Sequence, residues 1–256
     1  MYDVRAKKHL GQHFLKDDNI ARKIAGSLSG DVTRVLEVGP GTGVLTKFLL
    51  ETGYTDLKVV EVDRESVAYL EQNYPELKEA LISGDFLKMD LRTLFSDKFA
   101  IIGNFPYNIS SQIFFKAIEN RELVTELVGM IQQEVAQRIV AGPGSKTYGI
   151  LSVLLQAWFD IEYLFTVPPT VFVPPPKVTS AVIKFTRNKV DNLGCDTVLF
   201  HSVVKTAFNQ RRKTLHNALK PLADYQGDYA GKRAEQLSVA QFIELTNQIE
   251  SIKQTQ

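Results

Sequence analysis

Short apolar runs rich in β-branched residues alternate with amphipathic segments along most of the chain. This alternation is typical of parallel β-strands joined by crossover helices. It predicts an α/β fold of the Rossmann-like, doubly wound kind, with a mostly parallel seven-stranded sheet. The predicted strands are 34–38, 58–62, 80–83, 100–103, 124–131, 161–167 and 180–186.

The last two predicted strands are separated by a connection with five prolines, Pro168, Pro169, Pro174, Pro175 and Pro176. Proline removes a backbone donor and fixes φ, so this connection is unsuited to a helix. We therefore expect the two strands to form an antiparallel pair at one edge of the sheet.

The pattern changes after Arg187, where a polar stretch with a glycine is followed by helical periodicity without further strand signals. The change predicts two domains, an α/β domain of residues 1–187 and a small all-α domain of residues 188–256. Helices are expected at 197–208, 211–219 and 239–249.

Composition fits this division: the 256 residues are 44% hydrophobic, enough for one α/β core and a small appendage. The single cysteine, Cys195, excludes an intrachain disulfide and agrees with a reducing compartment. The first residues lack the apolar segment of a signal peptide, and the apolar stretch 149–159 is too short to cross a bilayer. We expect a cytoplasmic protein that does not enter a membrane.

A glycine-rich turn, Glu-Val-Gly-Pro-Gly-Thr-Gly at residues 37–43, follows the first predicted strand. Glycines such as Gly39 and Gly41 let the backbone approach a ligand closely, and ligands bind where the strand order of a doubly wound sheet reverses. The second strand leads to Glu61, at the spacing where a carboxylate accepts hydrogen bonds from ribose hydroxyls. Together they predict a nucleoside-containing ligand.

The spacing of the glycines distinguishes between two candidate cofactors, a dinucleotide and S-adenosylmethionine. It gives GxGxG, whereas the dinucleotide fingerprint is GxGxxG with a helix N-terminus facing a pyrophosphate. S-adenosylmethionine carries a sulfonium cation and no phosphate, which suits a turn preceded by the acidic Glu37. Asp85 and Phe86 follow the third strand and could hydrogen-bond and cover its adenine, although an ordinary turn with a core phenylalanine has the same pattern. We expect S-adenosylmethionine and no metal.

The tetrad Asn-Phe-Pro-Tyr follows the fourth predicted strand and indicates the reaction. The N6 of adenine is a poor nucleophile because its lone pair is delocalised into the ring. Hydrogen bonds from N6 to the Asn104 side-chain oxygen and the Phe105 carbonyl would localise that lone pair, while Pro106 stiffens the turn. Tyr107 can stack on an extruded base. The tetrad predicts methyl transfer to adenine N6 without a strong general base.

Five motifs, at residues 10–15, 37–43, 104–110, 172–178 and 208–215, together resemble those of the ribosomal RNA adenine dimethyltransferases. The resemblance covers nearly the whole chain. It implies that the side chain of Phe172 brackets a flipped adenine with Tyr107, although Phe172 alone would be assigned to the core. It also implies a set of cofactor contacts: His13, Leu15, Gly39, Glu61, Asp85 and Asn104.

Two residues depart from the family pattern. His13 stands where many relatives have asparagine, so a side-chain donor is kept and we expect altered pH sensitivity. Thr179 stands where relatives often have aspartate, which changes the hydrogen bonding expected in the proline-rich loop.

The family's products are two adjacent N6,N6-dimethyladenosines in a hairpin near the 3' end of small-subunit (16S) ribosomal RNA. The resemblance thus implies 16S rRNA, within the small subunit or its precursor, as the partner of a monomeric enzyme. Two stretches without acidic residues, 5–16 and 197–223, could hold its phosphates, although solvated helix faces have the same composition. The expected phosphate contacts are Arg5, Lys7, Lys8, Arg211, Arg212 and Lys213, whereas Lys205 and Lys220 are interpreted as solvated charges.

Three alternatives remain beside this interpretation. The antibiotic-resistance branch dimethylates one adenosine of 23S rRNA, but the arginine-rich motif 208–215 resembles the small-subunit branch. A DNA adenine methyltransferase shares the tetrad, yet no separate base-recognition domain of useful size is evident. A non-catalytic ribosome assembly factor would not need the intact Glu61 and Asn104.

Overall fold

The computed structural model describes residues 4–255, so the outermost residues of both predicted domains, 1–3 and 256, lie outside it. The strands in this range are β1 (Phe14–Leu15), β2 (Arg34–Val38), β3 (Asp56–Glu61), β4 (Leu81–Ser83), β5 (Phe99–Asn104), β6 (Val124–Gln132), β7 (Phe159–Val167), β8 (Phe172–Val173) and β9 (Ser180–Arg187). The α-helices are α1 (Asp18–Ala25), α2 (Thr46–Glu51), α3 (Arg64–Asn73), α4 (Ser110–Glu119), α5 (Gln133–Val140), α6 (Ile150–Gln156), α7 (Thr197–Asn209), α8 (Leu215–Ala218) and α9 (Val239–Thr255). Short 3₁₀ turns are η1 (Lys8–Leu10), η2 (Pro75–Leu77), η3 (Phe86–Lys88), η4 (Leu91–Thr93), η5 (Pro169–Val171) and η6 (Ala234–Gln236).

The chain divides into two compact units, Met1–Ala136 with Glu162–Arg187, and Gln137–Ile161 with Asn188–Gln256. The boundary expected after Arg187 is also a boundary between these units. Residues 137–161, which we expected in the α/β domain, group with the C-terminal helices because α6 packs on α7 and α9.

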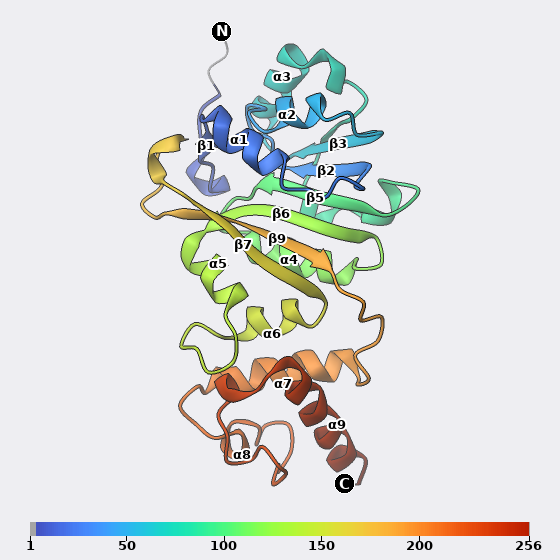
Figure 1. The fold of residues 1–256 in the computed structure, drawn as a ribbon, viewed down its shortest axis with the longest axis vertical. Coiled ribbons are helices and arrows are strands. Elements are labelled where there is room, and N and C mark those ends of the chain that lie inside the picture. Colours follow the sequence, from blue (N-terminus) through green and yellow to red (C-terminus); the bar gives the residue numbers. More distant parts are fainter. Residues whose placement is uncertain (1–3, 256) are drawn as a thin grey trace. The chain divides into compact units, whose positions relative to one another are not determined.

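The large sheet contains the seven predicted strands in the order β4-β3-β2-β5-β6-β9-β7 (Figure 1). Neighbouring strands from β4 to β6 run parallel, and β9 runs antiparallel to β6. The two strands flanking the proline-rich connection, β7 and β9, lie side by side at one edge, as expected. The strand order reverses between β2 and β5, so the carboxyl ends of these strands form the switch point.

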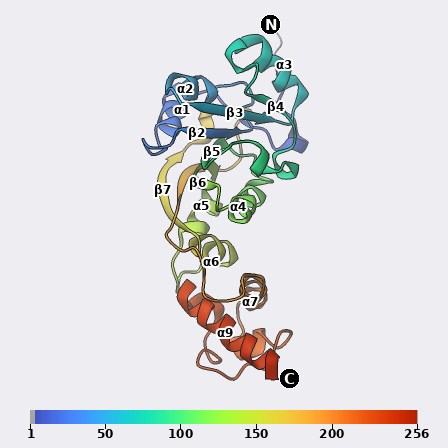
Figure 2. The same ribbon diagram turned by 90° about the vertical axis from the view of Figure 1, so that its right-hand side faces the viewer.

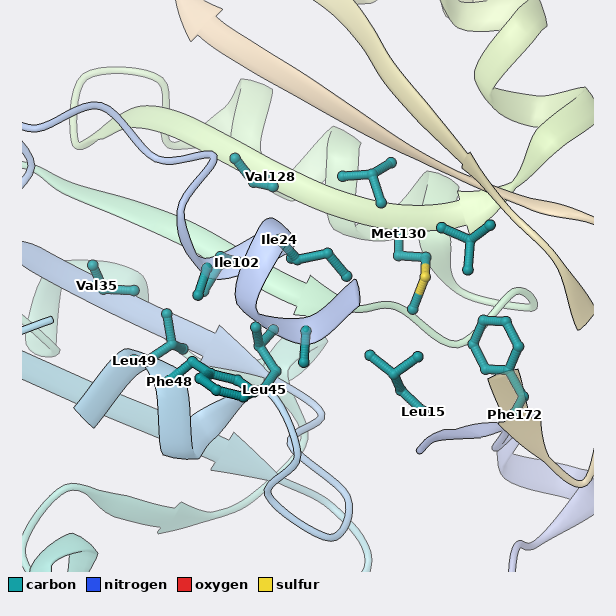
Figure 3. Close-up of a cluster of buried hydrophobic side chains, with 14 residues drawn as sticks. Leu15, Ile24, Val35, Leu45, Phe48, Leu49, Ile102, Val128, Met130 and Phe172 are labelled. Carbon is teal, nitrogen blue, oxygen red and sulfur yellow. The ribbon is translucent and has the colours of Figure 1, made fainter. Parts of the chain in front are cut away.

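Helices cover both faces of this sheet (Figure 2). Against one face, Ile24 of α1 and Phe48 of α2 join Ile102 of β5 in a buried apolar cluster (Figure 3). On β9, the alternation of side chains places Phe185 on the opposite face from Val182 of that cluster, and the ring centroids of Phe185 and Phe114 on α4 are 4.9 Å apart. Burial of each such side chain contributes about 2 kcal/mol to the stability of the fold. This packing holds in place the strand ends at which the site is built.

A second, two-stranded sheet joins the N-terminal segment to the proline-rich connection. In this antiparallel pair, Leu15 of β1 lies opposite Phe172 of β8, and Phe14 lies opposite Val173. Strands of two residues leave no periodicity to detect, so the sequence pattern did not predict them.

The helical unit is organised around Phe208 of α7. The centroid of its ring lies 6.0 Å from the ring centroid of Tyr148 and 5.7 Å from that of Phe242 on α9. The predicted helices 197–208 and 239–249 are confirmed as α7 and α9. The predicted helix 211–219 is wrong in its first half, because residues 210–213 form a turn and only Leu215–Ala218 is helical. In this turn the Arg211 guanidinium donates to the carbonyl oxygens of Lys146 (2.8 Å) and Tyr148 (3.4 Å). No helix between residues 4 and 255 is both long and apolar enough to cross a membrane.

Candidate active site

The glycine turn after β2 forms one side of the site. Gly39, Gly41 and Gly43 have φ values of 70°, 58° and 79°, in the left-handed region that favours glycine. A Cβ atom on Gly41 would also come within 2.8 Å of the Phe14 ring. The turn therefore requires glycine for its backbone conformation and, at Gly41, also for its close packing against Phe14.

Glu61, at the end of β3, holds this turn in place. Its carboxylate accepts hydrogen bonds from the backbone N–H groups of Gly41 (3.0 Å), Val62 (2.8 Å) and Asp63 (2.8 Å). Burial raises the pKa of Glu61, while the three N–H donors oppose that rise. A carboxylate offers about four acceptor positions, so it can still accept from ribose hydroxyls.

Glu37, in the preceding strand, is 1% exposed, and its Oε2 atom has no hydrogen-bond partner in the described chain. Burial raises the pKa of Glu37 to about 8, and the nearby Glu61 carboxylate adds to the rise. An unpartnered buried carboxyl is costly. The cost falls when a ligand cation or donor occupies the adjacent space, which fits S-adenosylmethionine.

The glycine turn, Glu37 and Glu61 line a cavity of about 220 Å³, far more than the roughly 10–15 Å³ that a single water molecule needs. The cavity brings together most of the predicted cofactor and catalytic residues at the switch point of the sheet. Among residues 4–255, no group of three His, Cys, Asp or Glu side chains is placed to hold a metal ion. The lining includes residues 10–15, 37–42, 60–62, 84–87 and 104–109.

The loop after β4, which the sequence predicts to contact the adenine, forms another side of the cavity. Asp85 accepts from the backbone N–H of Leu87 (3.0 Å), and Phe86 is buried. Lys116 of α4 braces this loop, because its Nζ donates to the carbonyl oxygens of Leu87 (2.9 Å) and Met89 (2.6 Å). No sequence pattern singled out Lys116, which is one basic residue in a largely apolar segment.

Asn104 stands at the carboxyl end of β5 and lines the cavity. Its Nδ2 donates to the backbone carbonyl of His13 at 2.9 Å. This contact uses the amide nitrogen and orients the amide, so that Oδ1 remains available as an acceptor. Phe105 follows with a ring that is 1% exposed, and Cβ atoms on Gly103 and Gly129 would come within 2.8 Å and 2.4 Å of it. Close packing of the ring thus fixes the backbone that carries the second predicted acceptor.

Tyr107 lines the same cavity and is held from two directions. Its hydroxyl forms a 2.5 Å hydrogen bond with Oγ of Ser180, which is fully buried at the start of β9. Its ring stacks on the His13 imidazole with centroids 5.5 Å apart, and His13 Nδ1 donates to the Pro174 carbonyl at 2.8 Å. Ser180 was missed because no local pattern connects it with the tetrad.

Phe172 lies elsewhere. Its ring is 1% exposed, belongs to the apolar cluster that contains Leu15 and Met130, and is not part of the cavity lining (Figure 3). This buried position is the one expected from the sequence alone, which would assign Phe172 to the core. Bracketing an adenine would require the ring to leave the cluster.

The basic residues predicted to contact phosphates fall into two groups. Lys7 and Arg211 have carboxylate partners: Lys7 Nζ lies 2.5 Å from Asp63 Oδ1, and Arg211 Nη2 lies 3.2 Å from Glu235 Oε2. Four others are exposed, namely Arg5, Lys8, Arg212 and Lys213.

The sheet order and the cavity at its switch point define a Rossmann-like methyltransferase. Solved structures agree with this fold: a dimethyladenosine transferase from Plasmodium falciparum superposes with a TM-score of 0.79 at 24% identity, covering 94% of this chain and 98% of that one. The 23S rRNA methyltransferase ErmE follows with a TM-score of 0.69 at 23% identity, covering 93% and 99%.

The chain belongs to the ribosomal RNA adenine dimethylase family, whose profile matches residues 4–251. It is 61% identical over 249 residues to the ribosomal RNA small subunit methyltransferase A of Parabacteroides distasonis, covering 95% of this chain and 93% of the relative. The Flavobacterium johnsoniae protein of the same name is 57% identical, with 98% of both chains covered.

Proposed function

We propose that the protein transfers methyl groups from S-adenosylmethionine to N6 of two adjacent adenosines in the 3'-terminal hairpin of 16S rRNA. The products would be N6,N6-dimethyladenosines, formed in the cytoplasm during small-subunit biogenesis. The names of the full-length relatives support this substrate. The observation that carries the chemistry is the position of Asn104. It lines the cavity, and its amide nitrogen donates to the His13 carbonyl, so that Oδ1 is left as an acceptor.

The residues that would hold the cofactor are the glycine turn, Glu37, Glu61, Asp85 and Phe86. S-adenosylmethionine supplies a methyl group on a sulfonium, whose positive charge needs no metal for activation. Glu61 would accept the ribose hydroxyls, and Asp85 with Phe86 would receive the adenine. Glu37 offers a buried acceptor to a ligand cation.

The residues of the tetrad would prepare the nucleophile. Asn104 Oδ1 and the Phe105 carbonyl accept the two N6 hydrogens, which localises the nitrogen lone pair. Tyr107 stacks on the extruded base and limits its orientation. The amino group becomes acidic once methylated, so its proton can pass to water and no side chain must act as a strong base.

The exposed basic residues would contact the RNA backbone. Arg5 and Lys8 precede the N-terminal wall of the cavity, and Arg212 with Lys213 lies in the turn before α8. Such contacts supply affinity and register but carry no sequence information. Four methyl transfers require repeated cofactor exchange, and we propose that a monomer carries them out.

The test supplies purified protein with labelled S-adenosylmethionine and, in parallel, unmethylated small subunits, large subunits and DNA. We expect label only in 16S rRNA, recovered as dimethyladenosine at two neighbouring positions. An Asn104→Ala preparation controls for contaminating methyltransferases. Label confined to large-subunit RNA or DNA would disprove the proposed substrate.

A further inference from the structure

One wall of the cavity is formed by residues 10–15, and its two ends are held differently. The C-terminal end is fixed by the pairing of β1 with β8 and by the hydrogen bond from Asn104 to the His13 carbonyl. The N-terminal end has no strand pairing. It begins after Lys7 with the 3₁₀ turn η1 and Gly11, whose φ is 67°.

This N-terminal end is attached to Asp63 by a closed set of contacts. Lys7 Nζ lies 2.5 Å from Asp63 Oδ1, and Gln12 Nε2 donates to Asp63 Oδ2 at 3.1 Å. The backbone N–H of Lys7 donates to Gln12 Oε1 at 2.8 Å, which joins the two side-chain contacts. Glu65 adds a second carboxylate 3.2 Å from Lys7 Nζ. We call Lys7, Gln12 and Asp63 the clasp.

The clasp is directly connected to the cofactor side of the cavity. The backbone N–H of Asp63 donates to Glu61 Oε1 at 2.8 Å, and Glu61 in turn holds the glycine turn through Gly41. The Asp63 side chain is 1% exposed, whereas that of Lys7 is 28% exposed. Burial by itself would raise the pKa of Asp63, but the hydrogen bonds from Lys7 and Gln12 outweigh it and lower the pKa.

A phosphate contact would take Lys7 away from this arrangement. A buried carboxylate that loses its cation is strongly destabilising, so RNA would have to compensate for Asp63. Lys8 is adjacent, exposed and free of that conflict. The positive charge of Lys7 is therefore committed within the protein.

We propose that the clasp holds the N-terminal wall against the cofactor, which makes Lys7 a positioning residue for S-adenosylmethionine rather than a phosphate ligand. The proposal rests on the proposed function only for the identity of the ligand. Opening of the clasp frees one end of the wall while the β1–β8 pairing keeps the other end attached. The clasp thereby sets how fast cofactor and product leave between successive methyl transfers.

The experiment compares Lys7→Met, which keeps an unbranched side chain of similar shape without the ammonium group, with Lys7→Arg, which keeps a charge for Asp63. Affinity and dissociation rate are measured for S-adenosylhomocysteine, together with hydrogen exchange of amides 7–15. For Lys7→Met we expect about tenfold weaker binding, mostly through faster dissociation, and faster amide exchange. Lys7→Arg should restore most of both. In Lys7→Met the KM for S-adenosylmethionine should rise while kcat stays within about twofold.

Two further lysines separate a positioning role from RNA binding. Lys8→Met should weaken binding to small subunits without changing cofactor affinity, and the exposed Lys78→Met should change neither. The proposal is overturned if Lys7→Met binds the cofactor normally and loses only subunit affinity. Unchanged amide exchange in residues 7–15 would also overturn it. Because cofactor binding is measured without RNA, these outcomes are independent of whether 16S rRNA is the substrate.

Discussion

The two sides of the cavity are built in different ways. On the cofactor side, the Glu61 carboxylate accepts hydrogen bonds from the backbone N–H groups of Gly41, Val62 and Asp63. These residues all belong to one continuous stretch, 41–63. On the acceptor side, Asn104 is oriented by His13, 91 residues away, and Tyr107 by Ser180, 73 residues away. The first side is specified locally, whereas the second exists only when distant segments have come together.

The largest effect that would test this division is expected for Asn104→Ala. If Asn104 accepts a hydrogen bond from the reacting nitrogen as proposed, its loss should slow methyl transfer about 10³-fold, comparable to the removal of one oxyanion-hole donor. Affinity for S-adenosylhomocysteine should fall by less than about tenfold. Single-turnover transfer to small subunits and calorimetric binding measure the two quantities.

The exposed Asn73→Ala serves as the control for this prediction and should leave both quantities unchanged. An equal loss of rate and affinity in Asn104→Ala would assign Asn104 to the cofactor side and remove the distinction between the two sides.

A smaller effect, of about 2 kcal/mol, should follow from the buried carboxyl of Glu37. Its pKa of about 8 lies above the ordinary value of 4.5, so the folded protein binds the proton more tightly than the unfolded chain. Stability therefore falls as pH rises between these values, by about 2 kcal/mol from about pH 6 to about pH 8. In Glu37→Gln this loss should be absent, as measured by urea unfolding of the apoprotein at each pH.

The exposed Glu79→Gln provides the matched comparison and should keep the pH dependence of the wild type. A Glu37→Gln variant with the same slope as the wild type would show that Glu37 is ionised in the folded protein.

The smallest effect is expected at the contact between Tyr107 and Ser180. Loss of one hydrogen bond, in Ser180→Ala or Tyr107→Phe, should lower kcat about fivefold through a less well-oriented ring, without changing the KM for S-adenosylmethionine. The double variant should be no slower than either single variant, because both remove the same bond. Additive losses would show that Ser180 does not act through Tyr107.

The same division explains which parts of the molecule could be predicted from its sequence. The seven strands of the large sheet were predicted from local periodicity, and the positions of the glycine turn, Glu61 and Asn104 in the cavity lining were predicted from motifs at strand ends. Ser180 and Lys116 were missed, because their partners lie far away in the sequence and no spacing rule connects them.

The charge pattern along the chain did not show which basic side chains have carboxylate partners. Lys7 and Arg211 look like their neighbours in the sequence, yet their carboxylate partners, Asp63 and Glu235, are supplied by other segments. Phe172 shows the converse, because the resemblance suggested a role at the substrate while its apolar neighbours indicated the buried position that it occupies.

The pairing of β1 with β8 has a consequence for how the enzyme is made. Translation delivers Leu15 early, but its partner Phe172 emerges more than half a chain later. A nascent chain that ends before β8 already contains the glycine turn and the tetrad, although one end of its cavity wall has no strand to pair with. The proline-rich connection must therefore be synthesised before this end of the cavity wall can be fixed by strand pairing.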